Sequence, residues 1–486
     1  MSFHNGEAFL KTLEPELFWP IEFEGIDAFR WTPPRFDIQI PAPGWRFATV
    51  RFCSPKRGNS LRLIAGDKII ELPLLEGWQR IDLESFGEPC VVCEVGEAIN
   101  EPGRGRVGLM LSEILFHDDA ERHAKISGRH RNAILNEAEF LAGVETLETV
   151  PAFLRLTLSK TCNIANEKPC VYCSWDWAKR LEAGAPDQDA AFLNRLGRHM
   201  DLALYVNDCS YGEPPLEKSF SEMVELATDT ERHFEFTSNG QTLSAKNRAR
   251  MLGRSVLVHI SIDAASAAGY NRYRDHSFDM IIDNLRAFVR EREAFNGKPE
   301  IFVSFIVMRS NVEEAGPFLR LMKDVGIDNV SFRTLYLEDR LEARRTVHYG
   351  FKFDYDAECL SAEELFALAP KLRTLGREVD IPTVVEWDDF PRNVGPRQAG
   401  EPLCSEPWKT AYLLNRGIMP CCYGREPMVS WSEVDQSNLE AGITQAINSE
   451  PFRQLRRDLR AGRLGAYCER AQGCPVVKAR RHAASS

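Results

Sequence analysis

The sequence has no stretch of about 18 uninterrupted apolar residues, the length that a membrane-spanning helix requires. Its first twenty residues lack the charged region followed by an apolar region that marks a secretory signal peptide. A basic excess is missing too, because 71 acidic and 60 basic residues give a formal net charge of -11. We therefore expect a cytoplasmic protein that binds no membrane and no nucleic acid, and whose substrate is a small molecule, a sugar or a peptide.

The 13 cysteines do not form a disulfide framework if the compartment is reducing, which leaves metal binding or redox chemistry as their use. Eight of them fall into two groups, at 162–173 and at 404–474. At 486 residues, the chain has room for about three domains, by the usual roughly 100–200 residues per domain.

Short strand-like runs separated by turn residues fill the first part of the chain. Such spacing is typical of an antiparallel sandwich, so we predict a β-sandwich of the jelly-roll type over residues 1–120 and a helical connector over 121–150. The predicted strands include Phe36–Ile40, Phe47–Phe52, Leu61–Ile64 and Val107–Leu111.

Beyond residue 150, apolar strands alternate with amphipathic helices, the pattern of a parallel βα architecture. This predicts an α/β fold with a partial (β/α)6 TIM-like barrel over residues 151–345, whose active groups gather at the carboxyl ends of the strands. The six predicted strands are Phe153–Leu158, Leu202–Val206, His233–Thr237, Leu257–Ile262, Ile301–Val307 and Val330–Leu335.

Three cysteines, Cys162, Cys170 and Cys173, directly follow the first predicted barrel strand. Soft thiolates select zinc or iron–sulfur clusters. A structural zinc site needs four protein ligands, and no fourth Cys or His lies on this loop. A cluster held by three thiolates instead keeps one iron open for another ligand.

With these cysteines and the motifs after the next strands, residues 150–345 resemble the radical S-adenosylmethionine (radical SAM) superfamily. Seven residues separate the first two cysteines, where the family usually has three, while the aromatic Tyr172 before the last cysteine is kept. The resemblance implies that the three cysteines hold a [4Fe–4S] cluster to which S-adenosylmethionine binds.

The resemblance also implies residues that contact S-adenosylmethionine. Gly212-Glu213-Pro is similar to the family's Gly-Gly-Glu-Pro element, and Glu213 would accept hydrogen bonds from the cofactor's ammonium group. Ser238 lies in a turn similar to Thr-Asn-Gly, and Arg274 would pair with the cofactor carboxylate. Polar capping at strand ends is the alternative interpretation. The full set of expected cofactor-binding residues is Tyr172, Gly212, Glu213, Ser238, Ser261, Asp263 and Arg274.

The second cysteine group looks like the C-terminal SPASM or twitch extension of radical SAM enzymes, here over residues 346–486. It implies one auxiliary [4Fe–4S] cluster in a small iron–sulfur domain, and structural zinc is the alternative. Adjacent Cys421 and Cys422 do not readily serve one metal together. The expected ligands are Cys404, Cys421 or Cys422, Cys468 and Cys474.

This resemblance implies an oxidoreductase or epimerase that reductively cleaves S-adenosylmethionine to a 5'-deoxyadenosyl radical. The electron donor would be a protein such as flavodoxin or ferredoxin. The strand-rich N-terminal region favours a carbohydrate or glycoconjugate as the molecule from which hydrogen is abstracted. One alternative is a ribosomal peptide maturase, and another is a non-catalytic zinc-binding scaffold.

Overall fold

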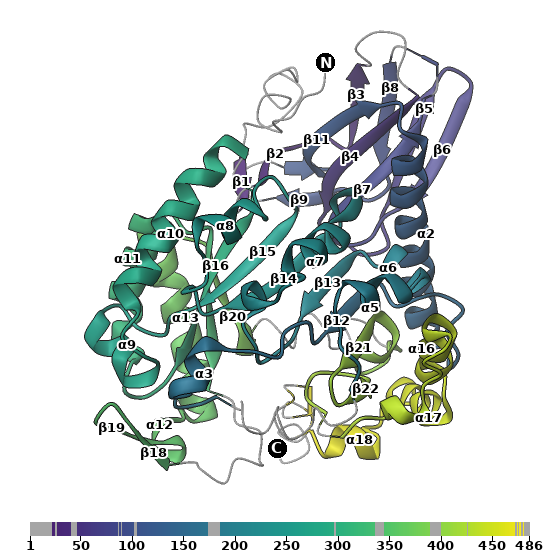
Figure 1. Cartoon of the computed structure of the whole chain (residues 1–486). Coiled ribbons are helices and arrows are strands. Elements are labelled where there is room, and N and C mark those ends of the chain that lie inside the picture. Colours follow the sequence, from purple (N-terminus) through teal and green to yellow (C-terminus); the bar gives the residue numbers. More distant parts are fainter. Residues whose placement is uncertain are drawn as a thin grey trace. The chain divides into compact units, whose positions relative to one another are not determined.

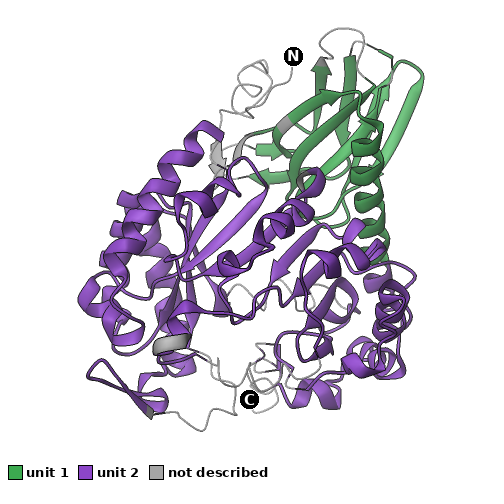
Figure 2. Cartoon of the chain, in the orientation of Figure 1, with its two compact units in different colours: residues 1–138 green, residues 139–486 purple. Residues whose placement is uncertain are grey.

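The computed structural model describes most of the chain, and the fold divides into two compact units, Met1–Ala138 and Glu139–Ser486 (Figure 2). The division falls within helix α2 (Ala120–Ala142). The described residues are 22–24, 27–39, 46–85, 87–88, 90–101, 105–173, 185–295, 298–335, 345–388, 400–424, 426–471, 474, 476–477 and 480.

The first unit contains two antiparallel sheets, one of five strands in the order β1-β2-β11-β4-β7 and one of four in the order β3-β8-β5-β6. Alternate residues of both sheets, such as Phe52, Leu63 and Cys93, share one apolar core. The strands are β1 (Glu22–Glu24), β2 (Asp27–Trp31), β3 (Arg35–Gln39), β4 (Phe47–Ser54), β5 (Ser60–Ala65), β6 (Lys68–Pro73), β7 (Gly77–Glu84), β8 (Cys90–Val95), β9 (Ile99–Glu101), β10 (Gly105–Val107) and β11 (Met110–His117).

The strand predicted at Val107–Leu111 is wrong, because this stretch contains the end of β10 and the start of β11. Thr32 binds Leu109, which lies between the two strands. The Thr32 N–H donates to the Leu109 carbonyl at 2.8 Å, and the Thr32 hydroxyl accepts from the Leu109 N–H at 2.9 Å. A side chain at Gly108 would come within 2.8 Å of the Pro33 carbonyl. The backbone therefore turns here, where apolar alternation alone suggested continuity.

The second unit is built on a nine-stranded sheet in the order β20-β17-β16-β15-β14-β13-β12-β21-β22, which is parallel except for the last pair (Figure 1). It is an α/β fold with a partial barrel. The strands are β12 (Phe153–Leu156), β13 (Tyr205–Asp208), β14 (His233–Ser238), β15 (Val256–Ser261), β16 (Glu300–Val307), β17 (Asn329–Thr334), β20 (Thr383–Val385), β21 (Thr410–Leu414) and β22 (Gly417–Met419), with a separate hairpin of β18 (Arg345–His348) and β19 (Phe351–Asp354).

Helices pack on one face of this sheet, where side chains such as Leu154, Phe236 and Val303 form the largest apolar core together with Phe288 and Phe318. We call the opposite face the inner face. No described helix is both long and apolar enough to cross a bilayer. The α-helices are α3 (Asn163–Glu167), α5 (Ala190–Arg195), α6 (Arg198–Asp201), α7 (Phe220–Ala227), α8 (Ala245–Ala249), α9 (Ala267–Tyr273), α10 (Phe278–Arg292), α11 (Ala315–Val325), α12 (Tyr355–Glu358), α13 (Ala362–Val379), α15 (Glu406–Lys409), α16 (Leu439–Ile447), α17 (Glu450–Arg460) and α18 (Ala466–Glu469).

Two expectations for the sheet need correction. The second barrel strand begins at Tyr205 rather than Leu202, because Leu202 caps helix α6 and its N–H bonds the Arg198 carbonyl. The sheet also extends past six strands: β20 pairs with β17 at one edge, and the β21–β22 hairpin pairs with β12 at the other.

Candidate metal and cofactor site

The cysteine segment, residues 162–173, begins six residues beyond the end of β12 and contains the short helix α3. All three of its thiols are half-buried. The Cys173 N–H bonds the Cys170 carbonyl at 2.9 Å, and the Val171 N–H bonds the Tyr273 carbonyl at 3.0 Å. These bonds fix the second half of the segment against the end of helix α9.

A buried ion pair lies beside this segment. Asp263 is fully buried, with a left-handed backbone (φ 63°), and accepts bonds from Arg274 Nε at 2.9 Å and Nη2 at 2.7 Å. The Tyr172 hydroxyl donates to the same carboxylate, and the Ile306 N–H donates to its other oxygen at 2.6 Å. The Asp263 carboxylate thus links the cysteine segment to β16, and both of its oxygens accept hydrogen bonds from other residues of the protein.

Arg274 also reaches the cysteines. Its Nη1 lies 3.8 Å from the Cys170 sulfur. Burial raises the pKa of Cys170 to about 11, while the Arg274 guanidinium opposes that rise. The positive charge therefore favours the thiolate, the form in which a cysteine binds metal.

Glu213 follows β13 and is almost fully buried. Its carboxylate accepts from Ser238 Oγ at 2.6 Å, from the Asn239 N–H at 2.8 Å and from the Thr242 hydroxyl. Burial raises the pKa of Glu213, and these three donors act against the rise. A carboxylate has about four acceptor positions, so one remains for a ligand.

Glu213 and the cysteine segment are held close together by backbone contacts. The Glu213 N–H bonds the Thr161 carbonyl at 2.6 Å. A side chain on Gly212 would come within 2.3 Å of Ser159 Oγ and 2.7 Å of its carbonyl, so only glycine permits this approach. Ser261, also half-buried, lies at the end of β15 with its hydroxyl 3.4 Å from Ser304 Oγ.

These groups suit a cluster that binds an amino-acid ligand. They are three cysteines, one buried carboxylate with a spare acceptor position, and one guanidinium near a thiol. Within the described residues, no three His, Cys, Asp or Glu side chains are placed to hold a single metal ion. A four-iron cluster does not need that convergence, since each cysteine binds a different iron. The donor set therefore fits a cluster site.

The second cysteine group lines a pocket bounded by α15, α17 and α18. Burial raises the pKa of Cys421, and the thiols of Cys422, Cys404, Cys468 and Cys474 raise it further. All five cysteines of the group thus lie in one pocket, and four of them raise the pKa of Cys421.

Cys422 differs from its neighbour. It is exposed, and the charges that act on it are those of Glu406, Cys209 and Arg155, with a hydrogen bond to Tyr412. Cys421 is half-buried, and the thiols of Cys404, Cys468 and Cys474 raise its pKa. Cys422 lines the same pocket, so its exposure is what distinguishes it from Cys421.

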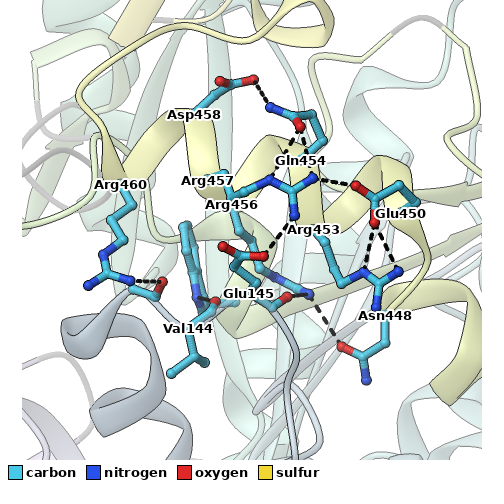
Figure 3. A network of polar contacts seen from close by, with 12 residues as sticks. Val144, Glu145, Asn448, Glu450, Arg453, Gln454, Arg456, Arg457, Asp458 and Arg460 are labelled. Atoms are coloured by element: carbon cyan, nitrogen blue, oxygen red, sulfur yellow. Dashed lines mark hydrogen bonds and ion pairs between the residues drawn. The ribbon is translucent and has the colours of Figure 1, made fainter.

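A network of polar contacts around α17 lies beside the second cysteine group (Figure 3). Arg456 of α17 is fully buried and donates to the Pro407 carbonyl at 3.0 and 2.8 Å and to the Glu145 carbonyl at 2.8 Å. Trp408 Nε1 donates to the Val144 carbonyl at 2.8 Å. The turn that carries Cys404 is therefore fixed to α17 and to the segment before the barrel.

Sequence reasoning missed Thr242 and a charged row on the inner face of the sheet. Neighbouring strands align Tyr412 with Arg155, Arg155 with Asn207, and Asn207 with Glu235. The signal was present, because Arg155 and Glu235 interrupt apolar strands at positions that alternate with core residues.

No protein-family model matches the chain. Over 179 residues it is 28% identical to the mycofactocin maturase MftC of Mycolicibacterium smegmatis, covering 36% of this chain and 43% of that protein. Over 186 residues it is 25% identical to the probable GTP 3',8-cyclase of Metallosphaera sedula, covering 38% and 55%. The chain thus spans about half the length of these curated relatives. The crystal structure of Streptococcus suis SuiB bound to S-adenosylmethionine aligns with a TM-score of 0.49 at 14% identity, covering 72% of this chain and 74% of that one.

These similarities support the predicted membership of the radical SAM superfamily. Members of this superfamily bind a [4Fe–4S] cluster and S-adenosylmethionine, and those similar to MftC carry auxiliary clusters. This chain is similar, over part of its length, to both a maturase and a cyclase.

Proposed function

We propose that this radical SAM enzyme modifies a peptide. The observation that carries the proposal is the 28% identity to a protein named as a maturase. This was the alternative to the carbohydrate prediction, and the comparisons give that first prediction no support.

In this proposal, the thiolates of Cys162, Cys170 and Cys173 hold the cluster to which S-adenosylmethionine binds. When bound, these two cofactors supply hydrogen-atom abstraction from a carbon of the substrate. Glu213 uses its remaining acceptor position for the cofactor ammonium, and Gly212 lets its loop approach the cysteine segment. A donor such as flavodoxin or ferredoxin supplies the electron, and the reducing cytosol that keeps thiols free is the expected location.

Asp263 has a positioning role in this proposal. It neutralises the buried Arg274 and anchors Tyr172, so that the guanidinium stays beside Cys170. Arg274 then contributes positive charge to the cluster site, and its Nη1 is the atom nearest the sulfur. Ser238 keeps Glu213 oriented through its 2.6 Å bond.

Cys404, Cys421, Cys468 and Cys474 hold the auxiliary [4Fe–4S] cluster in this proposal, and Cys422 does not. The support for the four is their common pocket and the effect of their thiols on one another's pKa values. Cys422 lines the same pocket, and its exposure is the reason to leave it out. Structural zinc on the same cysteines is the competing assignment, and metal analysis separates the two.

The test is anaerobic reconstitution with iron and sulfide, followed by detection of 5'-deoxyadenosine in the presence of peptide pools and, separately, oligosaccharide pools. We expect deuterium transfer into 5'-deoxyadenosine from deuterated peptides only. Product mass then separates the subclasses, since oxidation removes two hydrogens, while epimerisation in D2O replaces one carbon-bound hydrogen by deuterium without other change. Deuterium transfer from a sugar alone would contradict the proposal.

A further inference from the structure

The inner face of the barrel sheet carries charges that the proposed cluster sites do not use. The interior of a (β/α) barrel is usually filled by branched apolar side chains. Here Arg155 of β12, Glu235 of β14 and His259 of β15 occupy that face, while Leu154 and Phe236 on alternate positions pack under the helices. Charges in such a place are costly to bury and are retained where they serve a ligand.

Glu235 and His259 are in direct contact. His259 Nε2 lies 2.5 Å from Glu235 Oε1, and the two side chains are 8% and 14% exposed. Burial works to raise the pKa of Glu235, but His259, Arg155 and Arg333 together hold it below its usual range. The carboxylate is therefore ionised and already paired with the imidazole.

Arg155, in contrast, forms no ion pair within the described residues, although the charges of Glu235 and Glu406 act on it from a greater distance. Its recorded contacts are with the Cys209 thiol and with the ring of Tyr205, whose centroid lies 5.9 Å from the guanidinium carbon. The Nε of Arg155 is buried and has no hydrogen-bond acceptor in the described structure. A guanidinium has five N–H donors, so the Nε donor of Arg155 remains available to a ligand.

The carboxylates near Arg155 are engaged elsewhere. Glu235 bonds His259, and Glu406 accepts from the Tyr412 hydroxyl at 2.6 Å. The other inner-face arginine, Arg333, lies 2.8 Å from Glu386. Of these two inner-face arginines, Arg155 is thus the one that forms no ion pair within the described residues. A guanidinium can bind a planar anion through two parallel bonds.

We propose that Arg155 binds a carboxylate of the peptide substrate on the inner face, an inference that rests on the proposed peptide-modifying function. Tyr412 and Asn207, its neighbours on the adjoining strands, flank this site. The carboxylate belongs either to an acidic side chain or to the C-terminus of the peptide, and both present the same planar anion.

The experiment uses the reconstituted full-length enzyme and four synthetic octapeptide pools. Three of these pools are distinct in their carboxylates: one has a fixed Glu and an amidated C-terminus, and one has a fixed Gln and a free C-terminus. The third, with a fixed Gln and an amidated C-terminus, is the neutral partner of both, and the fourth is its independently synthesised replicate. Peptide-dependent 5'-deoxyadenosine formation is measured for each pool. We expect tenfold to hundredfold stronger stimulation by one carboxylate-bearing pool than by its neutral partner, the range of a charge-assisted bond.

Arg155→Met should abolish this preference, and Arg155→Lys should keep part of it, because lysine retains the charge but not the fork. Arg286→Met is the matched control: Arg286 lies on α10 in an exposed ion pair with Asp324, and its variant should keep the full preference. Iron content is measured on every sample to verify folding.

A preference that survives in Arg155→Met, or a wild type indifferent to carboxylate and amide, overturns the inference and leaves the peptide substrate standing. No stimulation by any pool, with cofactor cleavage intact under dithionite, overturns the peptide substrate and this inference together.

Discussion

Glu213→Gln tests the cofactor site most directly, because the side chain keeps its size and loses its charge. In the structure the carboxylate accepts bonds from Ser238, Asn239 and Thr242. The two hydroxyls can rotate to accept from an amide N–H, and the backbone N–H of Asn239 can face the amide oxygen. The local fold therefore tolerates glutamine, and the main loss is the charge-assisted bond to the cofactor ammonium.

A hydrogen bond to a charged group contributes about 1.5–3 kcal/mol, and a neutral one about 0.5–1.5 kcal/mol. Their difference, about 1–1.5 kcal/mol, corresponds to a fall in S-adenosylmethionine affinity of about fivefold to tenfold. Calorimetric titration of the reconstituted variant measures this, with iron counted on the same sample. Unchanged affinity would show that Glu213 is an ordinary turn residue, and lost iron would show that it supports the fold instead.

The matched control for this titration is Glu217→Gln. Glu217 lies on the same loop and also accepts three bonds, from Ser159 Oγ and the Lys160 N–H at 3.0 Å and from Thr161 Oγ1 at 3.2 Å. It is not expected to contact the cofactor. Its variant should bind S-adenosylmethionine as the wild type does, and an equal loss in both variants would mean that loop disorder, not a lost contact, weakens binding.

Four further outcomes follow from the structure. Replacing any cysteine of the cysteine segment by Ala should abolish 5'-deoxyadenosine formation, and substantial product from such a variant would contradict the cluster assignment. Iron analysis should give about eight irons per chain with both clusters and about four in Cys468→Ala, whereas about four irons and one zinc in the wild type would make the second site structural. Asp263→Asn leaves a buried guanidinium unpaired and should cost about 3–5 kcal/mol in unfolding free energy, so an unchanged denaturation midpoint would refute its positioning role. Burial lowers the pKa of His199 to about 4, from an ordinary value of 6.5 in the unfolded chain. The contribution of neutral His199 to stability is therefore fully present at a pH above about 6.5. That stability is lost at about 1.4 kcal/mol per pH unit as pH falls toward 4, and denaturation of His199→Gln against pH should show a shallower decline.

Most strands of the second unit's sheet could be predicted from the pattern of apolar residues in the sequence. Five of the six predicted barrel strands overlap the observed ones within about two residues at each end, the usual uncertainty of strand and helix boundaries, because each is a buried apolar run flanked by polar turns. The second strand was placed early because Leu202 continues the apolar pattern while its backbone caps α6. Pattern alone does not distinguish a helix cap from a strand start.

The expected site residues differ in how directly the sequence indicates them. Cysteine spacing and short motifs pointed to Cys162, Cys170, Cys173 and Glu213, because those signals are local in sequence. The contact of Arg274 with Asp263 was not anticipated: the arginine was expected to face the cofactor carboxylate, and in the structure two of its nitrogens bond the aspartate. Such pairings depend on which loops meet in space, which a single sequence does not specify.

The pairing of β12 with β21 has a consequence for how the enzyme is made. Phe153 lies opposite Thr410, so the first strand of the barrel finds its second neighbour only when a much later part of the chain is available. During synthesis β12 would present an unpaired edge, the kind of surface that recruits other strands. A nascent or truncated chain that stops before residue 410 should therefore be prone to aggregation, and the interval before β21 emerges is when a chaperone would be needed.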